Sequence, residues 1–340
     1  MARVAINGLG RIGRATLKIV LDTPGLDLVA ANDLGTPDDV AYLLRYDTVY
    51  GRYVKTVGAT ADGRLVVGGH QLTLLREPQP ARLPWRSLAV DIVFECTGAF
   101  TTRENLSHHI RAGASYVILS APSKSEDIET IVHGVNAPQA GTPIISCASC
   151  TTNCITPVVE ILGRRLGIKK ATMTTVHAYT ASQALVDTQR ENARRGRAGA
   201  ANLVPTSTGA ATATARALPE YRGRFDGVAI RVPIPVGSLA DIVALTETRA
   251  TVDEVNQIFA EEAASDRYRG VVGVTTDPLV SSDIIGDSRA SVVDLAMTQV
   301  VDGDLVKVMS WYDNEWGYSS QIVRAASRIA EALERPRLTA

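Results

Sequence analysis

The sequence predicts an α/β protein with two domains, one built on a doubly wound parallel sheet and the other an α+β unit with a mixed sheet. Short apolar strand patterns alternate with helical patterns through the first half of the 340 residues, as is typical of parallel sheets. The second half instead has longer strand patterns with few helical ones between them. A chain of this length can bury two substantial cores.

Composition narrows the class of function. The formal net charge is -1, with 35 basic and 36 acidic residues, so no broad electrostatic field favours nucleic acid or a membrane surface. No apolar run reaches the length that spans a bilayer, and the first residues enter a strand pattern without a leader segment. Four cysteines are too few for a disulfide framework, which favours reduced thiols and a cytoplasmic protein.

The first strand, turn and helix predict a dinucleotide site. An apolar strand at residues 4–6 leads into Gly8, Gly10 and Gly13, which match the pattern G-x-G-x-x-G, and a helical pattern follows. These glycines permit a tight turn and let backbone amides approach a pyrophosphate at the helix N-terminus. This context predicts a Rossmann-type domain.

A carboxylate in the expected place strengthens that interpretation. The second strand, at residues 26–31, is followed by Asp33, about 20 residues after the third glycine, where an acidic side chain binds the hydroxyls of the adenosine ribose. A carboxylate there repels a ribose 2′-phosphate, so NAD is favoured over NADP. The alternative is that Asp33 is an ordinary turn residue.

Three further strand patterns extend the parallel sheet, at residues 90–95, 116–120 and 143–146, with a helical pattern at 104–112. Small polar residues follow two of these strands, namely Thr97, Gly98 and Ser120. Because dinucleotides bind at the carboxyl ends of parallel strands, these three residues are predicted to contact the cofactor.

The most distinctive feature is a cysteine at the start of a predicted helix. Apolar residues recur at helical spacing after Cys150, so a helix is expected from about Cys150 to Gly167 with Ser149 as its N-cap. Free N–H groups and the helix dipole favour a thiolate there. His177 ends a β-branched strand at residues 173–177, where its ring can act as the base for the thiol. Cys150 and His177 are therefore the candidate catalytic residues.

Two other interpretations of these residues stay open. Cys150 and His177 can both be buried structural residues. The second interpretation is a zinc site, since Cys147 and Cys154 lie near Cys150. However, the pattern Cys-x2-Cys-x3-Cys lacks a second ligand pair at the spacing of known zinc motifs. No metal is therefore expected.

The second half predicts a mixed sheet covered by helices. Strand patterns lie at residues 170–176, 225–232, 240–248 and 305–311, and helical patterns lie at 209–218 and 252–264. A polar stretch at residues 181–202 carries arginines without periodicity, which indicates either a functional loop or a solvated arginine face. Candidate phosphate ligands surround it, namely Thr180, Arg195, the turn at residues 206–209 and Arg231, although a carboxylate can instead hold Arg231.

The domain boundary is expected beside the nucleophile. Residues 1–149 are predicted to form the NAD-binding domain and residues 150–317 the catalytic domain. Apolar residues at 319–333 recur on one face of a last helix, which is expected to pack back on the first domain. A helix within residues 318–340 would thereby complete that domain.

Five strings give the chain a family resemblance. They are AINGLGRIGR from Ala5, ASCTTNC from Ala148, TVHAYT from Thr175, VPTSTGAA from Val204 and WYDNEWGY from Trp311. On these strings the chain resembles the phosphorylating glyceraldehyde-3-phosphate dehydrogenases along nearly its whole length. The resemblance implies a homotetramer that uses NAD in glycolysis.

The resemblance also implies a mechanism. The cysteine attacks the aldehyde of glyceraldehyde 3-phosphate, and the histidine accepts the hydroxyl proton as hydride passes to NAD. Inorganic phosphate then cleaves the acyl thioester to give 1,3-bisphosphoglycerate. The substrate phosphate is assigned to Thr180 and Arg231, and inorganic phosphate to Ser149, Thr151, Arg195, Thr208 and Gly209. The cofactor is assigned to Arg11, Ile12, Arg76, Asn314 and Tyr318, with Asn314 on the nicotinamide carboxamide.

Some positions depart from the family pattern, and two other functions stay open. Cys147 stands where the family has asparagine, and Gln189 where NAD-specific members often carry proline. One other function is an erythrose-4-phosphate dehydrogenase, whose relatives lack the strings HAYT and PTSTG. The other is a non-catalytic NAD-binding or RNA-binding regulator, against which the intact Cys150 and His177 argue.

Overall fold

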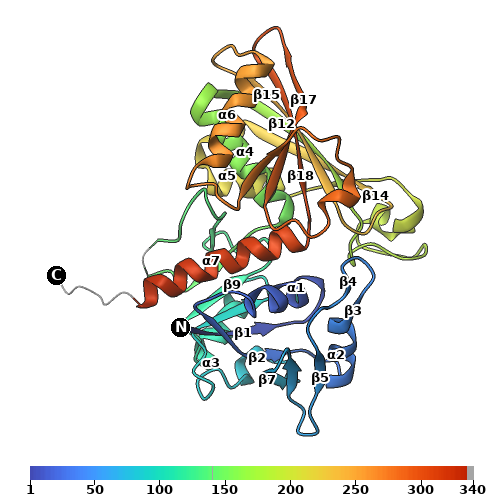
Figure 1. Ribbon diagram of the computed structural model, residues 1–340, viewed down its shortest axis with the longest axis vertical. Helices are drawn as coiled ribbons and strands as arrows, with labels where there is room; N and C mark the ends of the chain where they lie inside the picture. Colours follow the sequence, from blue (N-terminus) through green and yellow to red (C-terminus); the bar gives the residue numbers. More distant parts are fainter. Residues whose placement is uncertain (140, 335–340) are drawn as a thin grey trace, which may run out of the picture. The chain divides into compact units, whose positions relative to one another are not determined.

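The computed structural model describes residues 1–139 and 141–334, which form two compact units (Figure 1). Unit 1 contains Met1–Ile131, Pro138–Ala148 and the described residues from Ile322 onward. Unit 2 contains Val132–Ala137 and Ser149–Gln321. The glycine-rich turn therefore belongs to unit 1, and the candidate catalytic residues belong to unit 2.

Unit 1 is built on a nine-stranded, mainly parallel sheet with the order β10-β11-β9-β8-β1-β2-β7-β6-β5. Its strands are β1 (Ala2–Asn7), β2 (Leu26–Asn32), β5 (Val57–Ala59), β6 (Leu65–Val67), β7 (His70–Leu75), β8 (Ile92–Glu95), β9 (Tyr116–Leu119), β10 (Glu129–Thr130) and β11 (Ile144–Ser146). Only the pairings of β6 with β7 and with β5 are antiparallel in this sheet. β1 pairs in parallel with β2 on one side and β8 on the other, so the switch point of the sheet lies at the ends of β1 and β8.

Helices of unit 1 pack on this sheet. They are α1 (Arg11–Val20), which packs on β1 and β2, α2 (Pro37–Arg45), and α3 (Arg103–Ala112), which packs on β9 and β11. The sequence patterns did not predict α2, whose start has the form of a capping box. The Thr36 side chain accepts from Asp39 N, the Asp39 side chain accepts from Thr36 N, and Pro37 is the first helical residue. A two-stranded ribbon of β3 (Tyr46–Asp47) and β4 (Gly51–Arg52) follows α2.

Unit 2 is built on a seven-stranded mixed sheet with the order β13-β14-β12-β15-β18-β17-β16. Its strands are β12 (Ile168–Ala178), β13 (Val204–Ser207), β14 (Phe225–Val232), β15 (Ser238–Thr246), β16 (Val272–Thr275), β17 (Ser291–Val301) and β18 (Leu305–Tyr312). The helices α4 (Cys150–Leu166), α5 (Ala210–Ala217) and α6 (Val252–Ala264) pack on it. The two sheets confirm the predicted fold class.

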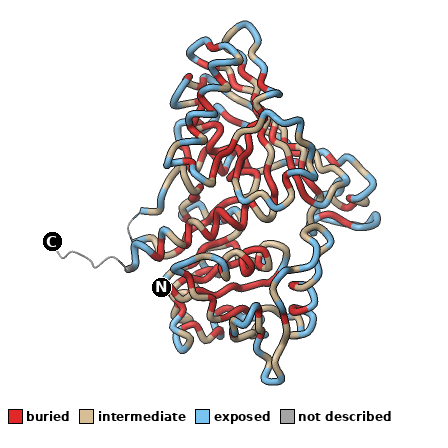
Figure 2. Tube along the Cα trace, in the orientation of Figure 1, coloured by how far each residue is buried: buried red, intermediate tan, exposed pale blue. Residues whose placement is uncertain are grey.

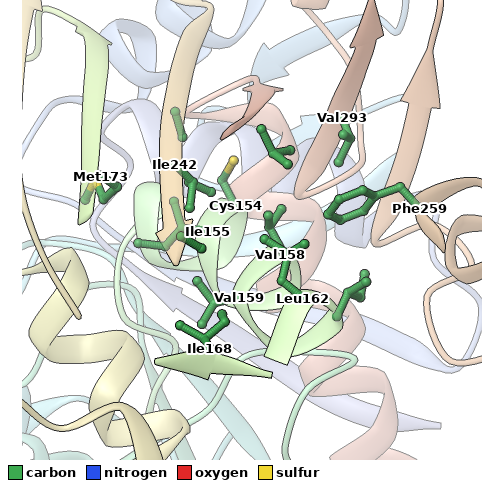
Figure 3. Packing of buried hydrophobic residues seen from close by; sticks show 14 of the residues in the cluster. Cys154, Ile155, Val158, Val159, Leu162, Ile168, Met173, Ile242, Phe259 and Val293 are labelled. Atoms are coloured by element: carbon green, nitrogen blue, oxygen red, sulfur yellow. The ribbon is translucent and has the colours of Figure 1, made fainter. Parts of the chain in front are cut away.

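The apolar side of α4 forms the centre of the core of unit 2. Cys154, Ile155, Val158 and Leu162 are fully buried and pack with side chains from the sheet and from α6, as Figure 3 shows. Each fully buried side chain of this size contributes about 1.5–3 kcal/mol through loss of contact with water. The packing holds the whole of α4, including Cys150 at its first turn. Figure 2 shows the same concentration of buried residues along the strands of each sheet.

Several predicted bounds differ from the structure. The strand predicted at residues 240–248 is β15, Ser238–Thr246, because side chains alternate between buried and half-buried from Ser238 to Thr246 and the Thr246 hydroxyl then donates to Thr248 O. The strand predicted at residues 90–95 begins only at Ile92. The sequence patterns missed β17, whose first four residues are all buried and therefore do not alternate.

The last helix is α7, Trp316–Glu334. Its residues up to Gln321 belong to unit 2, and those from Ile322 belong to unit 1. The part of the predicted C-terminal helix at residues 335–340 lies outside the described residues. Across the described part of the chain, no helix combines the length and the apolar character that a bilayer crossing requires.

Candidate active site

The candidate nucleophile is the first residue of α4. Ser149 caps this helix, with its hydroxyl oxygen accepting from Thr152 N at 3.1 Å. Cys150 is partly exposed, and its Sγ lies 3.4 Å from His177 Nε2. His177 is the penultimate residue of β12 and is 4 % exposed. A helix start and a strand end therefore bring the two residues together within hydrogen-bonding distance.

The second nitrogen of His177 fixes the ring. His177 Nδ1 lies 2.6 Å from Ala178 O, and Arg231 Nη1 lies 2.9 Å from that oxygen and 2.9 Å from Nδ1. A carbonyl oxygen only accepts, so we assign the proton of the neutral imidazole to Nδ1, on the shortest of these contacts. Nε2 then presents its lone pair to the thiol of Cys150. The ring is oriented as a general base.

The expectation of a lowered thiol pKa is wrong for Cys150 taken alone. Burial raises the pKa of the Cys150 thiol, against the opposing effects of Arg231 and of the Thr151 N–H. Burial, and the positive charge of Arg231, lower the pKa of His177 to about 3. Both groups are therefore neutral at pH 7 in the free protein. Proton transfer from sulfur to Nε2 creates opposite charges 3.4 Å apart, whose attraction of about 5 kcal/mol at an effective dielectric constant of 20 offsets part of the burial cost.

Thr151 faces inward. Its hydroxyl lies 2.9 Å from Tyr312 Oη, which also lies 2.8 Å from Thr175 Oγ1, and the Tyr312 ring meets the His177 ring edge-on with centroids 6.0 Å apart. Tyr312 therefore ties the start of α4 to β12 beside the candidate base. The Thr151 hydroxyl is held by this contact, and both this hydroxyl and the Thr151 N–H also lower the pKa of the adjacent Cys150 thiol.

Arg231 is a half-buried cation in β14. In the described part of the chain it has no carboxylate partner, and its Nε atom is buried without a hydrogen-bond acceptor. Arg195 Nε binds Thr206 Oγ1 at 3.3 Å, and the positive charge of Arg195 also lowers the pKa of His177. The alternative that a carboxylate holds Arg231 is therefore wrong. Two guanidinium groups near the catalytic pair favour an anionic ligand.

The other predicted phosphate ligands lie in the same unit. Thr180 Oγ1 is 2.8 Å from Ser182 Oγ, and Ala210 N at the start of α5 donates to Thr208 Oγ1 at 3.2 Å. A Cβ on Gly209 would have no atom within 4 Å, so space is open next to this backbone. The turn at residues 206–209 thus supplies polar groups beside open space.

Asn314 follows β18 and has a fixed amide. Its Oδ1 accepts from Gly237 N at 3.2 Å and from Ser238 Oγ at 3.0 Å, while Ser238 Oγ accepts from Ala178 N at 3.1 Å. Asn314 therefore keeps its amide nitrogen as the group that can donate to a ligand. Tyr318, in α7, is 3 % exposed.

Unit 1 contains a cavity of about 360 Å³ at the carboxyl ends of β1, β2 and β8. It is lined by Asn7, Gly8, Gly10, Asn32, Asp33, Leu34, Glu77, Pro78, Cys96, Thr97, Ala99 and Phe100. The cavity lies where the strand order switches direction, which is the place where α/β sheets bind nucleotides.

The glycine turn fits a dinucleotide at this cavity. A Cβ on Gly13 would lie 1.9 Å from Gly8 O, and one on Gly8, whose φ is +91°, would lie 2.8 Å from Thr97 N. Neither position accepts a side chain. A Cβ on Gly10 would meet no atom within 4 Å, so a phosphate can approach this backbone just before α1 begins at Arg11.

Comparison with known proteins identifies the family. Residues 149–314 match the C-terminal domain of glyceraldehyde 3-phosphate dehydrogenase, and residues 2–103 match its NAD binding domain. Glyceraldehyde-3-phosphate dehydrogenase 2 of Streptomyces avermitilis is 47% identical over 325 residues, which are 94% of this chain and 96% of the relative. The glyceraldehyde-3-phosphate dehydrogenase of Geobacillus stearothermophilus is 46% identical over 332 residues, which are 96% and 98% of the two chains.

The chain belongs to the glyceraldehyde-3-phosphate dehydrogenase family. Membership confirms the resemblance inferred from the sequence strings. It also identifies residues 2–103 as the NAD-binding domain of that family. These matches concern whole domains and assign no individual site residue.

Some of the predicted cofactor residues of this dehydrogenase line the cavity of unit 1, and others do not. Gly8, Gly10, Asp33 and Thr97 line the cavity of unit 1. Asp33 is already engaged, since its Oδ2 accepts from Leu9 N at 2.7 Å and its Oδ1 from Gly35 N at 2.9 Å. Its carboxylate thus shapes the turn as well as facing the cavity.

The remaining predicted residues of unit 1 do not line the cavity. Arg11 and Ile12 open α1, where the Arg11 side chain pairs with Asp47. Arg76 donates to Leu34 O at 3.2 Å, and Ser120 Oγ donates to Glu95 O at 2.9 Å. Gly98 has φ +72°. The sequence patterns missed the lining residues Asn7 and Asn32, although each is the last residue of a parallel strand, which is the signal that points to them.

The four thiols of the dehydrogenase are expected to differ in reactivity. Burial raises the pKa of Cys96, Cys147 and Cys154 to about 12, so at pH 8 only about one in 10⁴ of these groups is ionised. We expect iodoacetamide to modify only Cys150 in the native protein, which intact mass would show as a single addition. In guanidinium chloride all four thiols should react. Labelling of native Cys147 at a rate comparable with Cys150 would contradict this assignment.

Proposed function

We propose that Cys150 and His177 carry out the phosphorylating oxidation of glyceraldehyde 3-phosphate to 1,3-bisphosphoglycerate. Family membership makes the chain an NAD-dependent glyceraldehyde-3-phosphate dehydrogenase, and the proposal adds the role of each residue. The observation that carries it is the 3.4 Å contact between Cys150 Sγ and His177 Nε2 at the start of α4. A half-buried guanidinium, whose Nε is buried without an acceptor and which has no carboxylate partner among the described residues, supports a phosphorylated substrate.

His177 moves protons at Nε2 in this mechanism. It first takes the thiol proton, and Cys150 Sγ then bonds to the aldehyde carbon, whose oxygen receives that proton to complete a thiohemiacetal. NAD, when bound, supplies the acceptor for the hydride. As the hydrogen leaves the carbon, Nε2 takes the hydroxyl proton and an acyl thioester remains on Cys150. Phosphate oxygen then bonds to the acyl carbon, the carbon–sulfur bond breaks, and the thiolate recovers the proton from His177.

We assign binding residues to the substrate phosphate and to inorganic phosphate from the positions of cations and N–H groups. Arg231 and Thr180 are proposed to hold the substrate phosphate. Inorganic phosphate is assigned to the side chains of Ser149, Arg195 and Thr208 and to the backbone of Thr151 and Gly209. A dianion near Arg231 and Arg195 would cancel the positive charge that lowers the pKa of His177. Substrate binding would thereby make the ring a stronger base.

Location and assembly are also proposals. A cytoplasmic location is supported by four free cysteines, which are typical of a reducing compartment. A homotetramer is supported by the segment at residues 181–202 and the residue after it, where Leu185, Val186 and Leu203 are 82 %, 70 % and 68 % exposed. Apolar side chains so close together on one segment favour burial against a second copy.

The test of the reaction follows absorbance of reduced cofactor with glyceraldehyde 3-phosphate, with phosphate present or omitted and with NAD or NADP. We expect sustained turnover only with phosphate, because without it the acyl thioester stays on Cys150 and formation of NADH stops after about one equivalent per site. Erythrose 4-phosphate in place of the triose is the matched comparison. Faster turnover of the tetrose, or a rate independent of phosphate, would contradict the proposal.

A further inference from the structure

A buried carboxylate lies behind the wall of the cavity in unit 1. Glu95 is the last residue of β8 and is 0 % exposed. It does not line the cavity, but it binds two residues that do, Asn7 and Thr97. We infer that Glu95 is a positioning residue for NAD binding, and that Trp85 and His109 act through it. The inference rests on the proposed function in one respect, that this cavity holds the cofactor.

Four donors meet the Glu95 carboxylate. Oε1 accepts from Thr97 N at 2.8 Å and from Thr97 Oγ1. Oε2 accepts from Asn7 Nδ2 at 2.6 Å and lies 3.0 Å from His109 Nε2. Both carboxylate oxygens therefore act as acceptors from N–H groups, Oε1 from Thr97 N and Oε2 from Asn7 Nδ2.

Trp85 fixes the donor and acceptor roles at one end of this hydrogen-bonded chain, which runs from Trp85 through His109 to Glu95. The indole Nε1 can only donate, and it lies 2.9 Å from His109 Nδ1. His109 Nδ1 therefore carries a lone pair, and the ring proton is on Nε2, where it is donated to Glu95. All three side chains are fully buried, so water does not offer them other partners.

The backbone of Glu77 fixes the donor and acceptor roles at the other end of the chain, where Asn32 and Asn7 lead to Glu95. Glu77 N donates to Asn32 Oδ1 at 2.8 Å, and Asn32 Nδ2 donates to Glu77 O at 2.9 Å. These bonds fix the Asn32 amide, whose Nδ2 also donates to Asn7 Oδ1 at 2.7 Å. Asn7 must then turn its own Nδ2 toward Glu95. Donors converge on residue 95 from both ends.

Only an acceptor fits between these two ends. A glutamine at position 95 places its N–H either against the N–H groups of Asn7 and His109 or against the N–H of Thr97. In both orientations a residue that lines the cavity loses its partner and moves. Asn7 at the end of β1 and Thr97 after β8 share this one carboxylate, and Asn32 at the end of β2 is joined to it through Asn7, so its loss disturbs the cavity rather than the chemistry of unit 2.

The test measures NAD binding by titration calorimetry, together with kcat at saturating NAD, in Glu95→Gln. We expect the Kd for NAD to rise about 10- to 100-fold, as for an unsatisfied buried donor, with kcat within about twofold of the wild type. The matched control is Glu262→Gln, which also removes a buried carboxylate that binds several donors, here Arg164 and Arg165 in unit 2. It should lower the melting temperature without changing the Kd for NAD.

A second pair of variants separates positioning from folding. His109→Gln keeps an N–H donor near the place of Nε2, whereas His109→Leu removes it, and His109 does not line the cavity. We expect the Kd for NAD to rise about tenfold in His109→Leu and less than twofold in His109→Gln, since a lost hydrogen bond to a charged group is worth that much. A folded Glu95→Gln protein with the wild-type Kd would overturn the inference. If that variant does not fold, equal Kd values for the two His109 variants would do so. A wild-type protein that binds no NAD would instead contradict the proposed function.

Discussion

Replacing Cys150 by serine is expected to lower kcat by about six orders of magnitude, the scale found when a catalytic nucleophile is removed. A hydroxyl is far less acidic than a thiol, so His177, whose pKa is lowered to about 3, cannot take its proton to a useful extent. Serine also forms an ester, which phosphate cleaves more slowly than a thioester. The measurement is the initial rate of NADH formation with saturating triose phosphate, NAD and phosphate.

The matched control for this variant is Cys154→Ser. Cys154 lies one turn further along α4, is 0 % exposed and contacts Ser291 Oγ and Ser310 O, so a hydroxyl there finds hydrogen-bond partners. It should cost some stability and leave kcat near the wild-type value. The Cys150→Ser protein should keep the wild-type Kd for NAD, because the cavity of unit 1 contains no part of Cys150. Turnover within tenfold of the wild type would exclude Cys150 as the nucleophile.

The sequence was most informative at positions where the local structure accepts or strongly favours one residue type. Gly8 and Gly13 illustrate this, since a Cβ at either would overlap backbone atoms, and a spacing rule is enough to find them. The start of α4 at Cys150 was equally readable, because Ser149 is a strong N-cap and the apolar spacing that follows is helical. Gly13 and the start of α4 depend on neighbours within a few residues, which a sequence displays directly, whereas Gly8 is found by the spacing rule although its Cβ would meet the distant Thr97.

Features that depend on burial or on distant partners were not predictable. The raised pKa of Cys150 comes from desolvation, whereas the sequence showed only the helix start that opposes it. The inward turn of the Thr151 hydroxyl requires Tyr312, which is 161 residues away. Glu95 looks like an ordinary strand end, and its importance lies in donors from β1, α3 and the residues after β8. Such convergence is a property of the sheet and not of any segment.

Replacing His177 by asparagine is expected to lower kcat about 10²- to 10⁴-fold, the usual contribution of a general base. It should also change how the alkylation of Cys150 depends on pH. In the wild type the proton can pass from Cys150 Sγ to His177 Nε2. That step is independent of pH while both groups are neutral, which holds between the lowered pKa of His177, about 3, and the raised pKa of the Cys150 thiol.

Without His177, only loss of the thiol proton to solvent creates the nucleophile. Because burial raises the pKa of Cys150 above 9.0, the rate of alkylation by iodoacetamide in His177→Asn should rise about tenfold per pH unit from pH 6 to pH 8. The wild-type rate should be higher at pH 6 and should rise less steeply. The same comparison tests the direction of the proton: parallel profiles for the two proteins would show that Cys150 ionises without help from the ring. His177 would then act only in the later proton transfer at the thiohemiacetal hydroxyl, and the whole loss of kcat would have to come from that step.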